Sequence, residues 1–222
     1  MDLTQAIAER HSVRQYQNRP IEGETLAALQ RAVAECNAAG GLRIQLITEE
    51  NKAFDSPQAH YGKFTNVPAY LALIGPKGDG LEERCGYWGE KLVLTAQTLG
   101  LNTCWVGGTY KKIPDAYRIA PGEKLVIVIS VGYGATQGHT RKTKTFAEVA
   151  KAEGNVPQWF RDGVAAALLA PTALNQQKFT LTLQGDKVKA KAGLGFFTKT
   201  DLGIVKCHFE LGAGKDSSVW EK

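Results

Sequence analysis

Two arginines and a serine lie close together near the N-terminus, in the segment Arg10-His11-Ser12-Val13-Arg14. Arginine presents a fixed fork of N–H donors, and a serine hydroxyl can donate to a neighbouring oxygen, so this pattern suits the binding of a phosphate. The segment follows a short stretch with Leu3 and Ile7 at helical spacing. A solvated basic helix end would also explain the charges, because cations stabilise the C-terminal end of a helix.

A second basic run, Arg141-Lys142-Thr143-Lys144, is the densest in the chain. Nucleic-acid binding would require a larger basic face with interleaved aromatic residues, and the formal net charge is only +5. One small anionic ligand together with an ordinary solvated face explains the positive charge more simply. We therefore expect no nucleic-acid partner.

The cysteines and histidines are scattered along the chain, with no C-x-x-C pair and no metal-ligand spacing. This spacing argues against both a metal site and a disulfide framework, so buried free thiols are expected. Since none of the cysteines has a clear activating neighbour, covalent catalysis is not expected either. The residues concerned are Cys36, Cys85, Cys104, Cys207, His11, His60, His139 and His208.

A chain of 222 residues can bury a sizeable core as one domain or two small ones. No apolar run approaches the ~20 residues of a membrane span. The N-terminus lacks the apolar core of a signal peptide. We expect a cytoplasmic protein with no membrane partner.

The first half reads as helices and strands around a sheet. A helix is expected over 24–36, ended by Gly40-Gly41, and another over 90–99, ended by Gly100. Strands are expected over 42–48, 67–74 and 125–131, the last β-branched, continuous and covered on both faces. This is an α+β layout with a helix-covered sheet.

The second half repeats part of that order after a boundary near 151–157. It has an expected helix over 159–169, a hairpin of strands 178–183 and 187–192, and a helix over 200–212. The shared order of helix, strand and helix is a weak internal repeat. We therefore divide the chain into a first half, 1–150, and a shortened second half, 155–222.

Four segments resemble the FMN-dependent nitroreductase family. They are Arg-x-Ser-x-Arg-x-aromatic ending at Tyr16 and followed by Pro20-Ile21, the helix and turn over 90–108, the strand over 124–133 and the basic segment 140–149. The resemblance rests on the order and spacing of these four segments over residues 1–150, since no single segment would suffice. The resemblance implies a nitroreductase-like α+β fold with a mixed or antiparallel sheet.

A fifth segment makes the resemblance more specific. Residues 170–177 resemble the family loop Ala-Pro-Ser-x-x-Asn-x-Gln-Pro-Trp, which the equivalent 34–41 has lost. In the family, two identical chains share each flavin site, so this chain resembles such a dimer fused into one polypeptide, with one site kept. The resemblance implies a monomeric pseudo-dimer. The alternative is a separate small α+β domain that only caps the first half.

The resemblance also implies the flavin-binding residues. From the first half these are a phosphate motif, a basic pair, a lysine near the flavin N1/O2 edge and two glycines that let the backbone approach the ring: Arg10, His11, Ser12, Arg14, Lys142, Lys144, Lys63, Gly107 and Gly108. The second half contributes Pro171, Thr172, Ala173 and Asn175. The lysines could instead be solvated surface residues, and Gly107 a simple tight turn.

The implied activity is FMN-dependent reduction of a nitroaromatic, quinone or similar small-molecule acceptor, with NAD(P)H as co-substrate and two-electron transfer. The flavin would do the chemistry, so no side chain need act as an acid or base. Three departures from the family pattern stand out: Gly107 where many relatives have an acidic residue, Thr172 for serine, and Gln177-Lys178-Phe179 for Gln-Pro-Trp. A non-catalytic flavin-binding or regulatory protein is the alternative, and a protein that has lost flavin is a weaker one.

Overall fold

A computed structural model describes residues 1–50 and 52–221. The first part of the chain forms an antiparallel sheet with strand order β1-β2-β4-β3. Its strands are β1 (Gln45–Ile47), β2 (Ala69–Pro76), β3 (Asn102–Val106) and β4 (Glu123–Gly132). The expected central strand is confirmed, because β4 pairs with β2 on one side and β3 on the other.

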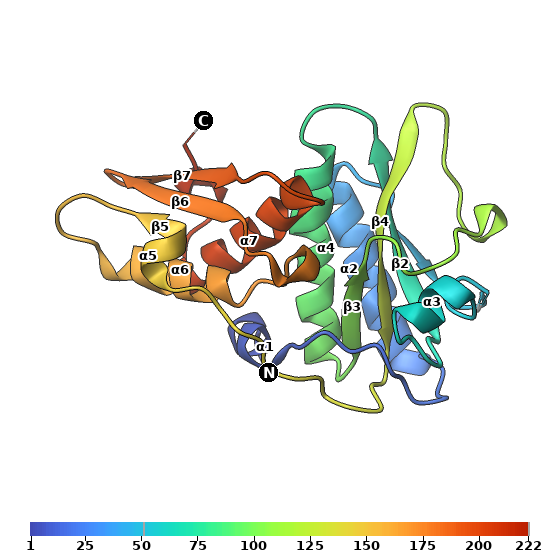
Figure 1. Ribbon diagram of the computed structural model, residues 1–222. Helices are drawn as coiled ribbons and strands as arrows, with labels where there is room; N and C mark the ends of the chain where they lie inside the picture. The colour runs from blue at the N-terminus through green and yellow to red at the C-terminus, as the bar shows by residue number, and fades with distance from the viewer. Residues whose placement is uncertain (51, 222) are drawn as a thin grey trace.

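Helices and loops cover both faces of this sheet (Figure 1). Successive residues of a strand point to opposite faces. Ile127 and Ile129 therefore pack with residues of α2 (Gly23–Gly40) and α4 (Leu81–Thr98), whereas Val128 packs on the other face with Phe54 and Phe64. The remaining helices of this part are the short α1 (Leu3–Glu9), α3 (Pro57–Tyr61) and the 3-10 turn η1 (Pro114–Ala116).

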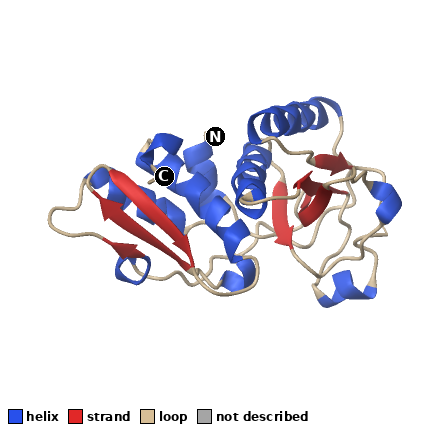
Figure 2. Cartoon of the chain, turned by 90° about the horizontal axis from the view of Figure 1, so that it is seen from above, coloured by secondary structure: helices blue, strands red, loops and turns tan. Residues whose placement is uncertain are grey.

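A second, mixed sheet forms from the rest of the chain, with strand order β5-β6-β7. Its strands are β5 (Ala150–Lys151), β6 (Phe179–Gln184) and β7 (Lys187–Ala192), packed with α5 (Phe146–Val149), α6 (Gln158–Leu168) and α7 (Thr198–Ala213). Two 3-10 turns, η2 (Ala173–Asn175) and η3 (Ser217–Val219), complete it. The expected hairpin and both helices are confirmed. Figure 2 shows the two sheets towards opposite ends of the molecule, with helices between them.

The helices α4 and α7 join the two parts, and glycines let them touch. A Cβ atom at Gly86 would collide with the carbonyl oxygen of Thr200, and one at Gly203 would collide with that of Glu83. Only glycine allows two backbones to approach this closely. The interface between the two parts is thus a helix pair in backbone contact.

Three elements differ from the sequence expectation. The strand expected over 42–48 shortens to Gln45–Ile47, because the Asn37 side chain hydrogen-bonds the backbone of Ile44. The Ile44 N–H donates to Asn37 Oδ1 at 2.6 Å, and Asn37 Nδ2 donates to Ile44 O at 2.9 Å. The helix expected from residue 90 begins at Leu81, where Gly80 adopts a left-handed backbone. The strand β3 was not expected, because residues 102–106 were assigned only to the turn after that helix.

The expected boundary also falls elsewhere. Ala150 pairs with Leu181 in the second sheet, and Val149 packs with Phe160 in its core. Residues 146–151 therefore belong with the second part, and the chain changes core between Gly132 and Phe146 rather than at 150–155. The sequence did not indicate where the chain changes core, because α5 and β5 are too short to show a periodic pattern.

Some broad expectations can also be compared with the structure. All four cysteines are buried and unpaired. Among the described helices, none has the length and apolar character that crossing a membrane requires. Within residues 1–50 and 52–221, no group of three or more His, Cys, Asp or Glu side chains could hold a metal ion.

Candidate functional site

The N-terminal motif lies along the open edge of β3. The backbone N–H of Val13 donates to Thr103 O at 2.9 Å, and Ser12 forms a parallel bridge with Thr103. The Tyr16 hydroxyl donates to Val13 O at 2.7 Å and lies 2.7 Å from Ser130 Oγ. With Val13 and Tyr16 buried, the alternating positions Ser12 and Arg14 face outward. The local fold thus presents these two predicted residues at the surface.

Arg10 differs from them because it lies inside the protein. Its side chain is 4% exposed, and its nearest acidic group is Glu90, with Nε 3.9 Å from Oε1. Among the described residues, Arg10 Nε has no hydrogen-bond partner. Burying a charged donor without partners is unfavourable. The carboxylate of Glu90 therefore balances part of the guanidinium charge, while the Nε–H of Arg10 remains available to a hydrogen-bond acceptor.

Glu90 connects Arg10 to both halves of the protein. Trp105 Nε1 donates to its Oε2 at 2.8 Å, and His208 Nε2 lies 2.8 Å from its Oε1. His208 Nδ1 lies 3.1 Å from the carbonyl oxygen of Ala166, so this nitrogen carries a proton. Neither Glu90 nor His208 is exposed. The sequence analysis missed both, although each is a polar residue on the inward stripe of a helix.

The basic segment docks on the loop between α6 and β6. Arg141 donates to Asn175 Oδ1 at 2.5 Å and to Ala170 O at 2.6 Å. Lys144 Nζ, in the same segment, donates to Gln177 O at 2.9 Å. In the opposite direction, Asn175 Nδ2 donates to Lys142 O at 2.8 Å. The structure thus brings together the predicted residues Lys142, Lys144 and Asn175, with Arg141 as an anchor that the sequence analysis left unassigned.

The stretch just before the basic segment reaches the N-terminal motif. A Cβ atom at Gly138 would lie only 2.6 Å from His11 Cβ, and the two stretches run together along the base of Figure 1. Burial, followed by the charges of Arg10, Arg141 and His139, lowers the pKa of His11. Cations from the N-terminal motif and from the basic segment therefore meet at one place, which favours an anionic ligand there.

The loop with Lys63 lies beside Arg14 and the turn after β3. The backbone N–H of Thr65 donates to Arg14 O at 3.0 Å, and the Arg14 guanidinium lies 5.9 Å from the centre of the Phe64 ring. A Cβ atom at Gly62 would lie 2.7 Å from Thr109 Cβ. Lys63 itself is exposed and has a left-handed backbone, with φ 63°. The first-half residues of the predicted site are thus neighbours in space.

A ring lies against Gly107, but it belongs to the protein. A Cβ atom there would lie 2.5 Å from Cε2 and Cζ of Phe197, the residue before α7. At Gly108, no described atom would lie within 4 Å of a Cβ. We expected glycine at 107 to admit a flavin ring; in this structure it admits Phe197. The sequence could not indicate this contact, which joins two distant segments.

The loop from the second half uses its side chains internally. Thr172 Oγ1 accepts from the backbone N–H of Gln177 at 3.0 Å, and Asn175 is bound by Arg141. Pro171 is buried, and the backbone N–H of Ala173 donates to Asp201 Oδ1 at 3.0 Å. Thr172 and Asn175 were expected to bind the flavin, but in this structure their polar groups bond within the protein, because short polar side chains readily bond nearby backbone.

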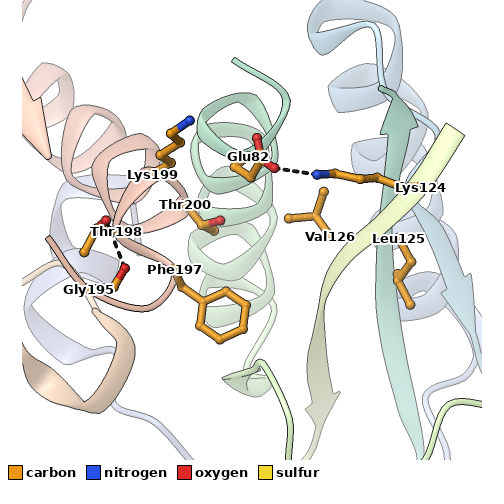
Figure 3. Close-up of a pocket in the computed structure, with 9 residues that line it drawn as sticks. All are labelled: Glu82, Lys124, Leu125, Val126, Gly195, Phe197, Thr198, Lys199 and Thr200. Carbon is orange, nitrogen blue, oxygen red and sulfur yellow. Dashed lines mark hydrogen bonds and ion pairs between the residues drawn. The ribbon is translucent and has the colours of Figure 1, made fainter. Parts of the chain in front are cut away.

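Two cavities lie along the contact between α4 and α7. One of about 380 Å³ adjoins Phe197 at the start of α7 (Figure 3), and another of about 620 Å³ lies between α4, α7 and Trp220. None of the residues predicted from the sequence lines either cavity. The Phe197 ring links the first cavity to the predicted site, since it forms a wall of that cavity and also covers Gly107.

Comparison with known protein families matches residues 2–213 to the family described as "Putative TM nitroreductase". No curated protein matches the chain. The match to the family covers nearly all of the sequence, including the second half.

Solved structures show the same fold. A putative nitroreductase from Thermotoga maritima is 24% identical, with a TM-score of 0.63, and the match covers 96% of this chain and 83% of that one. A putative NADH dehydrogenase/NAD(P)H nitroreductase from Parabacteroides distasonis is 22% identical, with a TM-score of 0.52 and coverage of 67% and 97%. A putative nitroreductase from Exiguobacterium sibiricum, solved in complex with FMN, is 16% identical, with a TM-score of 0.52 and coverage of 67% and 95%. The nitroreductase-like α+β fold expected from the sequence is therefore confirmed.

Proposed function

The chain belongs to the family described as "Putative TM nitroreductase", and from this premise we propose that it is an FMN-dependent oxidoreductase. In this proposal NAD(P)H supplies two electrons, and a nitroaromatic, quinone or similar small molecule accepts them. Bound FMN supplies the electron-transfer chemistry, while the protein binds and orients it.

The buried guanidinium of Arg10 is the observation that carries the proposal. It lies where the N-terminal motif meets the basic segment, and its Nε lacks a partner among the described residues. A phosphate oxygen would supply the missing acceptor, and its negative charge would be favourable beside Arg10 and Arg141. The donor set at this junction therefore fits the phosphate end of FMN.

Other residues would hold the rest of the cofactor. Ser12 and Arg14 are exposed on the same edge, and Lys142 is exposed beside the loop of the second half. Lys63, next to the Gly107–Gly108 turn, would place a cation near the ring edge, where it stabilises negative charge. Lys144 and Asn175 would act through the loop they brace rather than by direct contact.

We also propose that the two halves form a pseudo-dimer that holds one flavin per chain without a partner chain. The contact between α4 and α7 supports this, because each helix contributes a glycine and a carbonyl group to it. The hydrogen bonds between segment 141–144 and loop 170–177 support it as well. They join the flavin-binding residues predicted in the first half to those predicted in the second half, within one polypeptide.

A flavin-binding protein without turnover is the second candidate, and the Phe197 ring over Gly107 favours it. A ring held there would take up room beside the turn at which the isoalloxazine is proposed to lie, so less space would remain for an electron acceptor. The two candidates differ in whether purified protein oxidises NAD(P)H with a quinone acceptor.

The test is a fluorescence titration of the protein with FMN. Removal of the Arg10 side chain in Arg10→Ala should weaken binding at least about tenfold, the loss expected for a charge-assisted hydrogen bond. The control is Arg19→Ala, because Arg19 is an exposed arginine that follows the motif and whose guanidinium lies 3.8 Å from the centre of the Tyr133 ring. Equal FMN affinity in Arg10→Ala and the native protein would remove Arg10 from the site.

A further inference from the structure

The start of α7 leaves hydrogen-bond donors unused at the wall of a cavity. Phe197 occupies the N-cap position of this helix and cannot cap it with a side-chain hydrogen bond. The first N–H groups of a helix need partners from outside the helix, and they favour negative charge. The residues of this first turn, Thr198, Lys199 and Thr200, all line the cavity of about 380 Å³.

A buried hydroxyl gives independent support for a ligand at this place. Thr200 is 1% exposed, and its Oγ1 has no hydrogen-bond partner in the part of the chain that the structure describes. Figure 3 shows the side chain at the cavity wall, between α7, α4 and Val126. Buried hydroxyls are nearly always satisfied in folded proteins, so an acceptor supplied by a ligand would complete this group.

The charges at the cavity favour an anion. Lys124 and Lys199 line it together with a single carboxylate, Glu82. Lys124 Nζ lies 2.5 Å from Glu82 Oε1, so that carboxylate is already paired. Lys199 is exposed and has no ion-pair partner among the described residues, which leaves one free cation beside the helix N-terminus.

The opposite wall is apolar and adjoins the proposed flavin site. The ring of Phe197 and the side chain of Val126 form it, as Figure 3 shows, whereas the Leu125 side chain points to the other face of the sheet. The same Phe197 ring covers Gly107. A flat ring packed against Phe197 would therefore lie next to the turn at which we place the isoalloxazine. The volume falls in the usual range of small-molecule pockets, roughly 300–1,000 Å³.

From these observations we infer that this cavity binds the carboxylate of an aromatic electron acceptor, with the carboxylate between Lys199, Thr200 Oγ1 and the first N–H groups of α7, and the ring against Phe197. The inference rests on the proposed function, because it names the class of acceptor for the same site. Thr200 and Lys199 would then select carboxylated over neutral acceptors.

The experiment compares 4-nitrobenzoate with its methyl ester, which has the same ring and nitro group but no charge. Calorimetric titration of the purified full-length protein gives the affinity for each, and steady-state kinetics with NADH or NADPH gives KM for each as the acceptor. We expect the acid to bind more tightly and to have the lower KM. The variants Thr200→Val and Lys199→Gln should each weaken binding of the acid by about tenfold and leave the ester unchanged.

The matched control is Lys191→Gln, which removes an exposed lysine from β7. It should leave both ligands unaffected. Lys199→Gln changes only a surface side chain, so it decides the matter even if Thr200→Val folds poorly.

Equal affinity for acid and ester, or a preference for the acid that neither variant changes, would overturn the inference while turnover could still support the proposed function. If the acid binds preferentially but neither the acid, its ester nor a quinone is reduced, the binding site stands and the proposed oxidoreductase function fails.

Discussion

Gly86 of α4 and Gly203 of α7 occupy reciprocal positions in the contact between their helices. Gly86 is the sixth residue of α4 and meets the carbonyl of Thr200, the third residue of α7. Gly203 is the sixth residue of α7 and meets the carbonyl of Glu83, the third residue of α4. Two identical surfaces related by a two-fold axis make contacts of this kind. The relationship supports the proposal that the chain is a fused dimer.

Replacing either glycine with alanine should destabilise the protein. The added methyl group would force the two helix backbones apart, and overpacking of this kind costs about 1–3 kcal/mol or more. Chemical denaturation of Gly86→Ala and Gly203→Ala measures the change. Gly108→Ala is the control, since its methyl group would meet no described atom within 4 Å. Normal stability of both helix variants would show that the helices can separate without loss.

The pairing of Arg10 with Glu90 predicts opposite effects on folding and on ligand binding. Glu90→Gln leaves the buried Arg10 cation without its carboxylate, and breaking a buried pair in this way costs about 3–5 kcal/mol. The melting temperature should therefore fall. A bound phosphate would replace the missing negative charge, so FMN should bind more tightly to the variant and raise its melting temperature more than that of the native protein.

Glu83→Gln is the control for that experiment, because the Glu83–Lys206 pair lies near the surface. Partly exposed pairs contribute little, about 0–1 kcal/mol, and the change should be small. Weaker FMN binding by Glu90→Gln at unchanged stability would show that Glu90 does not compete with the phosphate for Arg10.

Asp201 should make the protein less stable as the pH rises through the weakly acidic range. Burial raises the pKa of its carboxyl group to about 6, although Gln176 and the Ala173 N–H bond to it and act in the opposite direction. Between the unfolded pKa of 3.8 and about 6, the folded state holds a proton that the unfolded state has released. Stability contributed by that proton is present at lower pH and is lost as the pH rises past about 6.

The measurement is the free energy of unfolding at pH values on either side of that range, for the native protein and for Asp201→Asn. The variant does not titrate, so its stability should fall less, or rise more, with increasing pH. Other carboxylates, such as Glu82 with its lowered pKa, give the opposite slope and cancel in the comparison. The same pH dependence in both proteins would contradict the raised pKa.

Local sequence patterns predicted most of the fold. The helix and hairpin of the second half were expected within a residue or two of α6, β6 and β7, because apolar spacing and turn residues are local signals. The strand β1 is shorter than expected because the amide of Asn37, in the preceding helix, takes the backbone groups of Ile44. A pattern of apolar residues contains no information on that competition.

The site was less predictable because its decisive contacts link distant segments. The motif from Arg10 to Arg14 was visible as a cluster of donors, but the burial of Arg10 against Glu90 depends on how α4 packs. The burial of His208 and the position of Phe197 over Gly107 likewise follow from the contact of α7 with the first half. Residue types predicted a phosphate site, whereas tertiary packing decides which of the predicted donors lack a partner in the described structure.

A protein that ends at Gly154 should lose both its compact fold and its flavin. The missing residues include α7, which packs along α4, and Ala166 and Cys207, which pack with Leu94 and Ile7. Without them, apolar surface on α4 meets water, and Glu90 loses its contact with His208.

The measurement combines binding of a fluorescent hydrophobic dye with an FMN titration, for the shortened and full-length proteins. We expect strong dye binding and no FMN binding by the shortened protein. The full-length protein should bind one FMN per chain at every protein concentration, because tethering keeps the two halves together. If residues 1–154 alone stay compact and bind FMN, the second half is an appendage and the fused-dimer proposal is wrong.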